Sequence, residues 1–151
     1  MTQQTDLIGY CGLYCGDCAG YTQTVANLAK ELRSELRRHR FAQMAPMLAK
    51  VPMFKEFKDY EKCYNLLGTM VKMRCNKTCR GNGGPPKCEV RQCCRKNKIQ
   101  GCWVCDDFKK CKKLKFLEEH HGVAHLKNLR KIKKEGPKAF VIGKRYWYAA
   151  K

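Results

Sequence analysis

Residues 75–111 read CNKTCRGNGGPPKCEVRQCCRKNKIQGCWVCDDFKKC and contain eight of the twelve cysteines of the chain. The same stretch is rich in glycine and proline and has very few large aliphatic residues. Such a segment cannot bury enough apolar surface to offset the conformational entropy that it loses on folding. We therefore expect thiolates bound to a metal to hold it in one conformation.

The rest of the chain supplies a modest hydrophobic core, since 44% of the 151 residues are hydrophobic. We expect one domain over residues 1–151, in which 8–20 and 75–111 form a cysteine-rich metal lobe and 22–73 and 121–136 form the helical part. The first residues lack the pattern of a signal peptide, and no stretch is apolar enough to span a membrane. The expected location is cytoplasmic, where thiols stay reduced, and this favours metal binding over disulfides.

Two pairs of cysteines within the long stretch have the spacing of zinc ligands. Cys102 and Cys105 are separated by two residues, as in a zinc knuckle, and Cys75 and Cys79 by three. Together they give the pattern C-x3-C-x22-C-x2-C, which is close to that of a four-thiolate zinc site.

A further group of cysteines lies near the N-terminus. Cys11, Cys15 and Cys18 follow one another with three and then two residues between them. Gly12 and Gly16 allow the backbone to turn tightly enough for neighbouring thiols to face one ion. We expect this group to join the long stretch, so that thiolates from both parts of the chain share the metal.

There are more expected ligands than two metal sites require. They are Cys11, Cys15, Cys18, Cys75, Cys79, Cys88, Cys93, Cys102, Cys105 and Cys111. Two zinc ions with four thiolates each use eight of these ten, so either two are bystanders or histidine helps to build a third site. The sequence does not choose the pairing. We leave out Cys94, because adjacent side chains rarely reach one ion, and we interpret Cys63 as a small buried thiol.

Several spaced motifs together resemble a known family. They are CGLYCGDCAGY at 11–21, CxxxCRG at 75–81, CEVRQC at 88–93, GCxxC at 101–105 and DFKKC at 107–111. In this order they resemble the domain of unknown function 3795, a small cysteine-rich family of bacteria and archaea that is described as zinc-binding. The likeness spans roughly residues 8–117, and LKNLRKIKKEGPKAF resembles the helix that often ends those proteins. The resemblance implies a metal site. It does not indicate any activity, because none is assigned to the family. In this chain the spacing of Cys75 and Cys79 is one residue longer than usual, and Cys94 is extra.

An iron–sulfur cluster is the alternative to zinc. The spacing of Cys11, Cys15 and Cys18 matches the three cysteines of radical enzymes that bind S-adenosylmethionine, but the chain lacks the length and the strand–helix alternation of their barrel. A simple electron-transfer cluster, or an open metal site with three protein ligands, stays an alternative that would make the protein a redox protein or an enzyme. No catalytic triad or carboxylate pair can be recognised, and we interpret His121 and His125 as a solvated or partly packed pair.

Hydrophobic periodicity predicts a mainly α-helical fold. Residues 24–40 have an amphipathic pattern whose inward stripe would contain Val25, Leu28, Leu32 and Leu36. A second helix is expected over 52–73 and a last one over 122–135, with Gly136-Pro137 as the stop and the tail as a strand or an extended segment. The cysteine-rich lobe is expected to consist of turns, short hairpins and one short helix near 107–117.

The chain is strongly basic, with a formal net charge of +19. Two four-thiolate zinc sites would lower this to roughly +15. Residues 72–115 contain fourteen Lys or Arg against three acids, and the tail mixes cations with aromatic residues. This composition favours RNA or DNA as a partner, and the alternative is that the lysines only solvate the lobe. An accessory module that binds proteins is a third interpretation.

Overall fold

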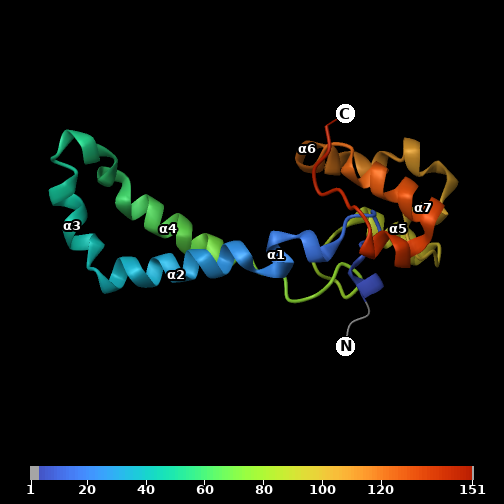
Figure 1. Cartoon of the computed structure of the whole chain (residues 1–151), viewed down its shortest axis with the longest axis horizontal. Coiled ribbons are helices and arrows are strands. Elements are labelled where there is room, and N and C mark those ends of the chain that lie inside the picture. The colour runs from blue at the N-terminus through green and yellow to red at the C-terminus, as the bar shows by residue number, and fades with distance from the viewer. Residues whose placement is uncertain (1–3, 151) are drawn as a thin grey trace. The chain divides into compact units, whose positions relative to one another are not determined.

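The computed structural model describes residues 4–150 of the chain (Figure 1). The chain divides into two compact units: residues 23–74, which we call the helical hairpin, and the residues up to Thr22 together with those from Cys75 on, which we call the cysteine unit. As predicted, the fold is mainly helical. Within residues 4–150 there is no β-strand, only two isolated bridges, Ile8 with Tyr14 and Gly122 with Ala149. A search of the same residues finds no helix with the length and apolarity needed to cross a membrane.

The helical hairpin consists of three α-helices and one 3₁₀ segment. They are α2 (Thr24–Arg38), α3 (Phe41–Leu48), a 3₁₀ helix (Pro52–Asp59) and α4 (Tyr60–Val71). Helix α2 confirms the first predicted helix, and the second one begins as a 3₁₀ helix with Pro52 in its first turn. Helices α2 and α4 lie side by side and run antiparallel (Figure 1).

The side chains that α2 buries differ from the expectation. Val25, Leu28 and Leu32 were expected to face inward, but they are 41%, 60% and 48% exposed. Ala26 and Ala29 are buried instead. Helical periodicity shows which residues share one side of a helix, but it does not show which of them contact a neighbouring helix. In α2 the small alanines allow α4 to approach closely.

The cysteine unit contains short helical segments and one long helix. Its α-helices are α1 (Ala19–Thr22), α5 (Glu89–Lys96), α6 (Glu118–His121) and α7 (Ala124–Ile142). Its 3₁₀ helices are Gln4–Leu7, Cys15–Asp17, Cys102–Val104, Asp106–Lys110 and Lys112–Leu117. The 3₁₀ helices and α5 occupy the stretch for which short hairpins were expected.

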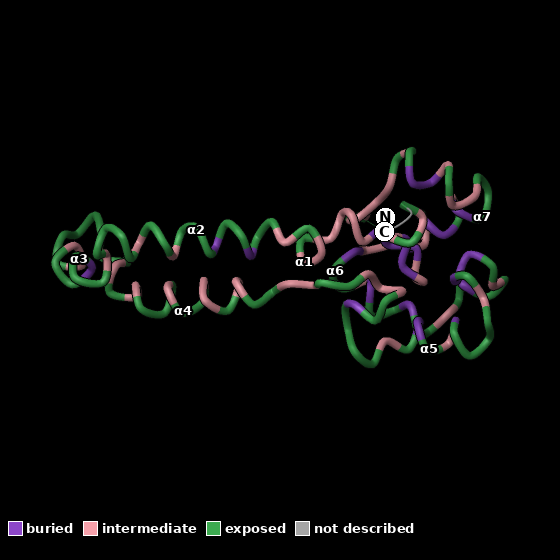
Figure 2. The backbone as a smooth tube through the Cα atoms, turned by 90° about the horizontal axis from the view of Figure 1, so that it is seen from below, coloured by how far each residue is buried: buried purple, intermediate pink, exposed green. Residues whose placement is uncertain are grey.

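The main hydrophobic core lies in the cysteine unit, where buried residues are concentrated (Figure 2). Its largest fully buried apolar side chains are Phe140, Ile8, Leu114, Leu129, Ile132 and Val90. The last predicted helix ends at Gly136, where φ is 83°, but the chain resumes helical structure and α7 continues to Ile142. Pro137 is compatible with this because it starts the new helical turn, where its missing N–H is not needed.

Candidate metal centre

Six of the ten predicted cysteine ligands line one cavity of about 350 Å³ in the cysteine unit. These are Cys11, Cys15, Cys18, Cys75, Cys79 and Cys88. They come from two segments that are more than fifty residues apart in the sequence, and the fold brings both segments to the same cavity. The N-terminal cysteines and the long cysteine-rich stretch thus meet at one cavity, and the sharing of a metal by their thiolates stays a prediction.

Two glycines leave room between the cysteines of the two segments. A Cβ atom placed on Gly20 would lie 3.7 Å from Cys18 Sγ and 3.8 Å from the Cβ of Cys75. A Cβ atom on Gly9 would lie 3.6 Å from Cys11 Sγ and 3.7 Å from the Cβ of Cys79. Each glycine thus stands between an N-terminal thiol and a cysteine of the later segment, so the two sets face one another at close range.

Backbone N–H groups point at two of the sulfur atoms. The N–H of Cys79 donates to Cys15 Sγ at 3.4 Å, and the N–H of Gly84 donates to Cys75 Sγ at 3.3 Å. Amide donors of this kind stabilise a thiolate more than a thiol, and in metal sites they tune the bound sulfur.

Close backbone packing around Cys75 requires a glycine at position 83. A Cβ on Gly83 would lie 1.9 Å from the carbonyl oxygen of Lys77 and 2.8 Å from Cys75 Sγ. No side chain fits in this space, so the glycine-rich loop has a structural role in the site and is more than a linker.

Arg91 on α5 holds the same loop from inside. Its side chain is buried, and it donates to the carbonyl oxygens of Gly83 at 2.6 Å, Pro85 at 2.7 Å and Pro86 at 3.0 Å. Among the described residues no carboxylate pairs with it. A buried guanidinium without a counter-charge is unfavourable. Because Arg91 also lines the cavity, ionised thiolates there would supply the missing negative charge.

The tail of the chain anchors the N-terminal cysteines. Arg145 donates two hydrogen bonds of 3.0 Å to the carboxylate of Asp17, which lies between Cys15 and Cys18. The guanidinium also lies over the ring of Tyr14, 4.5 Å from its centroid. This bidentate pair fixes the turn that carries two of the thiols, and sequence reasoning missed it because its partners are 128 residues apart.

Burial affects the pKa of two of the thiols at this cavity, Cys11 and Cys15. Burial is the main cause that raises the pKa of Cys11 to about 12, and the neighbouring Cys79 and Cys88 act in the same direction. Burial also raises the pKa of Cys15, where Cys79, Cys18 and Cys75 act in the same direction. The thiols that interact electrostatically fall into two sets. Cys15 interacts with Cys18, Cys75 and Cys79, and Cys11 interacts with Cys79 and Cys88.

A second sulfur group lies in the core of the unit and includes a residue that sequence reasoning left out. Cys94 Sγ and Cys102 Sγ are 3.8 Å apart, and both residues are buried. The two thiols share one hydrogen bond, which lowers the pKa of Cys94 and raises that of Cys102. Cys11 and Cys111 act on Cys102 as well, so this group adjoins the first one.

The other predicted ligands are placed differently. Cys93 lines a separate shallow pocket with Lys96 and Lys113, where its sulfur accepts a hydrogen bond from Asn97. Cys105 is not among the residues that line the six-cysteine cavity. Cys63, which was interpreted as buried, is exposed on α4, since it lies outside the face that packs on α2.

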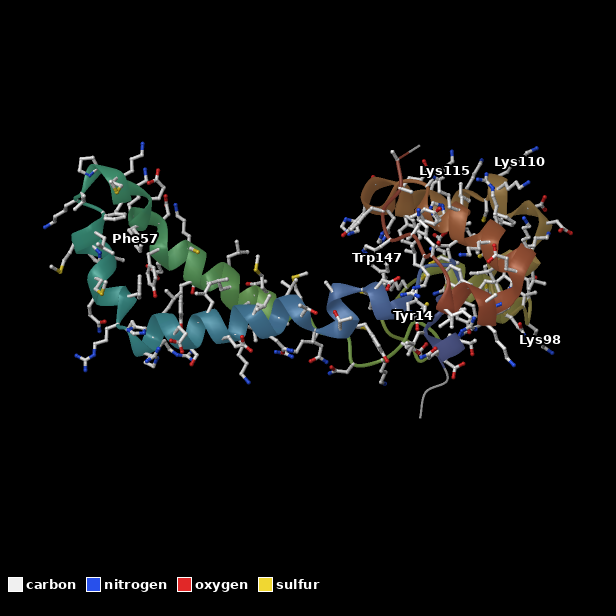
Figure 3. The ribbon with its side chains drawn as sticks, in the orientation of Figure 1. Tyr14, Phe57, Lys98, Lys110, Lys115 and Trp147 are labelled. Carbon is white, nitrogen blue, oxygen red and sulfur yellow. The ribbon has the colours of Figure 1, made fainter. Side chains whose placement is uncertain are left out.

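Aromatic and histidine side chains also line the cavity. They are Tyr14, Tyr21, Phe116, His120, His121 and Trp147. Figure 3 labels Tyr14 and Trp147 within this unit. His121 Nδ1 lies 2.8 Å from the carbonyl oxygen of Trp147; because a carbonyl only accepts, Nδ1 carries the proton.

The interpretation of His121 and His125 as a solvated or partly packed pair was wrong, because both are buried. Helix α6 ends at His121 and α7 begins at Ala124, and Trp147 and Tyr148 of the tail pack on the ring of His121. Burial lowers the pKa of each, and Nδ1 of His125 has no hydrogen-bond partner among the described residues.

The donor set fits a thiolate-bound metal. Six thiols, two amide donors to sulfur and an uncompensated buried arginine all converge on one cavity. Within residues 4–150, however, no group of three or more His, Cys, Asp or Glu side chains is already arranged around a single point as metal ligands. The side chains share the cavity, and rotation about their Cα–Cβ bonds would be needed to complete a coordination sphere.

A family model described as "Protein of unknown function (DUF3795)" matches residues 7–116. The chain therefore belongs to this family, as its cysteine motifs predicted. No curated protein and no solved structure matches the chain at a significant level. The matched region contains all the cysteines, whereas Phe116 is the last matched residue and the histidine and Trp147 part of the cavity wall lies beyond it.

Proposed function

We propose that this member of the DUF3795 family is a structural zinc module, in which zinc bound by thiolates ties the N-terminal segment to the segment from Cys75 on. The observation that carries the proposal is the convergence of six cysteines from these two segments on one cavity. Structural zinc contributes directly to folding energy, and a segment with few aliphatic residues is where such a contribution is needed.

The first zinc site would use Cys15, Cys18, Cys75 and Cys79. Cys15 has the other three as near neighbours, and the two amides that donate to sulfur belong to this group. Four thiolates and one Zn²⁺ have a net charge of about −2, which would offset the positive charge of the buried Arg91. Cys11 and Cys88 stand next to this set, and a second zinc would use thiols of the group around Cys102.

Metal analysis of cysteine variants tests this assignment. The full chain is purified as the wild type and as the variants Cys75→Ser and Cys93→Ser, and zinc per chain is measured. We expect Cys75→Ser to lose one zinc and Cys93→Ser to keep the wild-type content, because Cys93 lies in a different pocket. Equal losses in both variants, or no zinc in the wild type, would contradict the proposal.

An iron–sulfur cluster is the second candidate, and the size of the cavity favours it. One tetrahedral zinc occupies little more than the space between its four sulfurs, whereas this cavity has a volume of about 350 Å³ and six cysteines. Anaerobic purification with iron and sulfide analysis separates the two candidates. Iron with sulfide and visible absorbance would replace the zinc proposal with a redox one, and colourless protein with zinc would exclude the cluster.

RNA or DNA is the partner that we propose for the basic surface. All five lysines between positions 109 and 115 are exposed, on two 3₁₀ helices with Cys111 between them. In Figure 3, Lys110 and Lys115 project from the same edge of the cysteine unit, while Lys98 projects from another. A row of exposed cations on a metal-stabilised scaffold suits the phosphate backbone, which is contacted without regard to base sequence.

The salt dependence of binding to single-stranded RNA and DNA tests this partner. We expect affinity to fall steeply as salt rises, and the slope of log K against log salt to decrease by about 0.7 for each phosphate contact that is lost. The test variant replaces the exposed lysines at 109, 110, 112, 113 and 115 by glutamine. The control replaces five exposed lysines of the helical hairpin, at 30, 50, 55, 58 and 62. Binding that is independent of salt, or equally weakened in both variants, would contradict the assignment.

A further inference from the structure

The helical hairpin lacks a core of its own. Within the described residues 23–74 only three are buried, and all three are alanines: Ala26, Ala29 and Ala45. Among residues 4–150, ten of the fourteen exposed large hydrophobic residues belong to this unit of 52 residues. Short helices gain most of their stability from packing an apolar face, and here a large part of that face is uncovered.

Contacts between α2 and α4 define how the two helices are aligned. Arg33 lies over the ring of Tyr64, 4.3 Å from its centroid, and Arg37 donates to the hydroxyl of Tyr64 at 3.3 Å. At the other end of the pair, Arg74 donates to the side chain of Gln23 at 2.6 Å. In this antiparallel register, Leu28 lies opposite Met70 and Leu32 lies opposite Leu66.

The apolar residues of both helices lie on the same side of the hairpin. At about 100° per residue, Val25, Leu28 and Leu32 form a stripe beside the alanines that pack on α4. On α4 the corresponding stripe lies beside Tyr64 and Gly68, which pack on α2. Because the helices are antiparallel, both stripes turn to one side and join into a single face. Its members are Val25, Leu28, Leu32, Leu66, Met70 and Met73.

This apolar face is exposed, whereas the opposite face of the hairpin is polar. Leu28, Leu66 and Met73 are 60%, 55% and 60% exposed. The opposite face carries residues such as Asn27, Lys30 and Ser34 of α2 and Asn65 and Lys72 of α4. The hairpin is thus amphipathic as a whole, and one side of it is suited to contact with another apolar surface.

We propose that this face binds the same face of a second copy of the chain, so that two helical hairpins form a four-helix bundle. A two-fold axis brings the apolar face of one copy against that of the other, which gives both copies the core that a single hairpin lacks. The proposal is independent of the metal centre, because all the residues of the face belong to the hairpin.

The size of the face matches what a stable dimer requires. Given the exposed fractions of Val25, Leu28, Leu32, Leu66 and Met73, the face presents roughly 500 Å² of apolar surface, at the upper end of the largest patch on a typical monomer. A stable dimer buries about 800 Å² on each partner, somewhat more than half of it apolar. The apolar surface of the face is therefore about as large as the apolar part of such an interface.

The charges along the rim favour a second copy over an unrelated partner. Glu31 and Glu35 flank the face on α2, and Lys62 flanks it on α4. Glu35 and Lys62 remain exposed at 54% and 85%, although they form surface ion pairs with Arg38 and Asp59. A two-fold axis parallel to the helices places α2 of one copy over α4 of the other, and the two glutamates then lie beside Lys62 of the partner subunit. The surface is complementary to itself in charge as well as in hydrophobicity.

Sedimentation of the full, metal-loaded chain over a wide range of concentrations tests the proposal. We expect a monomer–dimer equilibrium in the wild type. Leu28→Glu should weaken it by about 100-fold or more, because the dimer would bury a charge against an apolar surface. Asn27→Glu introduces the same charge one position away on the polar face and should leave the equilibrium unchanged.

Helix content by circular dichroism shows that both variants fold, since each change is at an exposed position. A wild-type chain that stays monomeric at high micromolar concentration would overturn the proposal. So would a dimer that persists in Leu28→Glu, or one that Asn27→Glu disrupts to the same degree. Covering of the face by another part of the same chain, or by a different protein, would give the first of these results.

Discussion

The two units of the chain are stabilised in different ways. The cysteine unit surrounds its thiols with a core that includes Leu114 and Phe140, and it even buries the charged Arg91. The helical hairpin has the more regular secondary structure but buries only alanines (Figure 2). Regular helices are therefore no guide to where the stability of this protein lies. Most of its buried side chains belong to the irregular, glycine-rich cysteine unit. Most of its exposed large apolar side chains belong to the regular helical hairpin.

Removal of the metal should have the largest effect, and it should affect the stability of the two units differently. A strong chelator should unfold the cysteine unit, because apparent binding energies of structural zinc are about 10–16 kcal/mol and exceed the stability of most domains. The helical hairpin, which contains no predicted ligand, should keep its helices. Hydrogen exchange followed by mass spectrometry measures both units in one experiment. A loss of protection confined to the hairpin, or no change in either unit, would contradict the view that only the cysteine unit depends on metal.

Replacement of the buried arginine should have the next largest effect. Arg91→Met removes the hydrogen bonds to three loop carbonyls and the one Lys or Arg among the described residues that line the cavity, and we expect a loss of about 3–5 kcal/mol in the free energy of unfolding. Zinc affinity should fall with it. Lys87→Met is the matched control, because Lys87 is an exposed residue of the same segment. Denaturant titration of both variants gives the comparison, and equal values would contradict the role of Arg91.

Truncation of one large side chain in each unit sharpens the contrast further. Leu114 is buried in the cysteine unit, so Leu114→Ala should cost about 2–5 kcal/mol. Met53 is 80% exposed in the hairpin and lies outside the apolar face, so Met53→Ala should change stability by less than about 0.5 kcal/mol. Thermal unfolding measures both. A large effect of Met53→Ala would mean that the hairpin has packing that this account does not include.

The smallest expected effect is on the pH dependence of the cysteine unit. His125 is buried near Glu118 and His121, and burial lowers its pKa below the usual 6.5. The unfolded chain then binds a proton that the folded chain does not, so stability falls as the pH drops below about 6.5, by about 1 kcal/mol for each pH unit. His125→Gln should flatten this decline. His39→Gln, at an exposed position in the hairpin, should not, and the same slope in all three proteins would contradict the assignment.

Much of the site could be predicted from sequence because thiol spacing is a local property. The cluster of Cys11, Cys15 and Cys18 and the pair Cys75 and Cys79 were identified from intervals of two or three residues, and all five line the cavity. Such intervals do not indicate which side of a helix a cysteine occupies. Cys93 and Cys94 are neighbours on α5 and point to different environments, so the expected ligand lies in a surface pocket and the excluded residue lies in the core.

The parts that sequence could not predict depend on contacts between distant residues. The pair of Asp17 and Arg145 and the place of Trp147 at the cavity arise only when the tail folds back on the N-terminal segment. The helices α2 and α4 were predicted from their periodicity, but the inward stripe was wrong. An apolar stripe shows that a helix needs a partner, and it does not show that the partner belongs to the same chain.

The central claim is that the six-cysteine cavity holds a metal through thiolates of both segments. X-ray absorption at the zinc edge, on the full chain as purified, tests it most directly. The account predicts about four sulfur neighbours at about 2.3 Å for each zinc, and a lower sulfur count when Cys15 and Cys75 are both replaced by serine. A first shell of oxygen and nitrogen, or a shell that the double variant leaves unchanged, would contradict it.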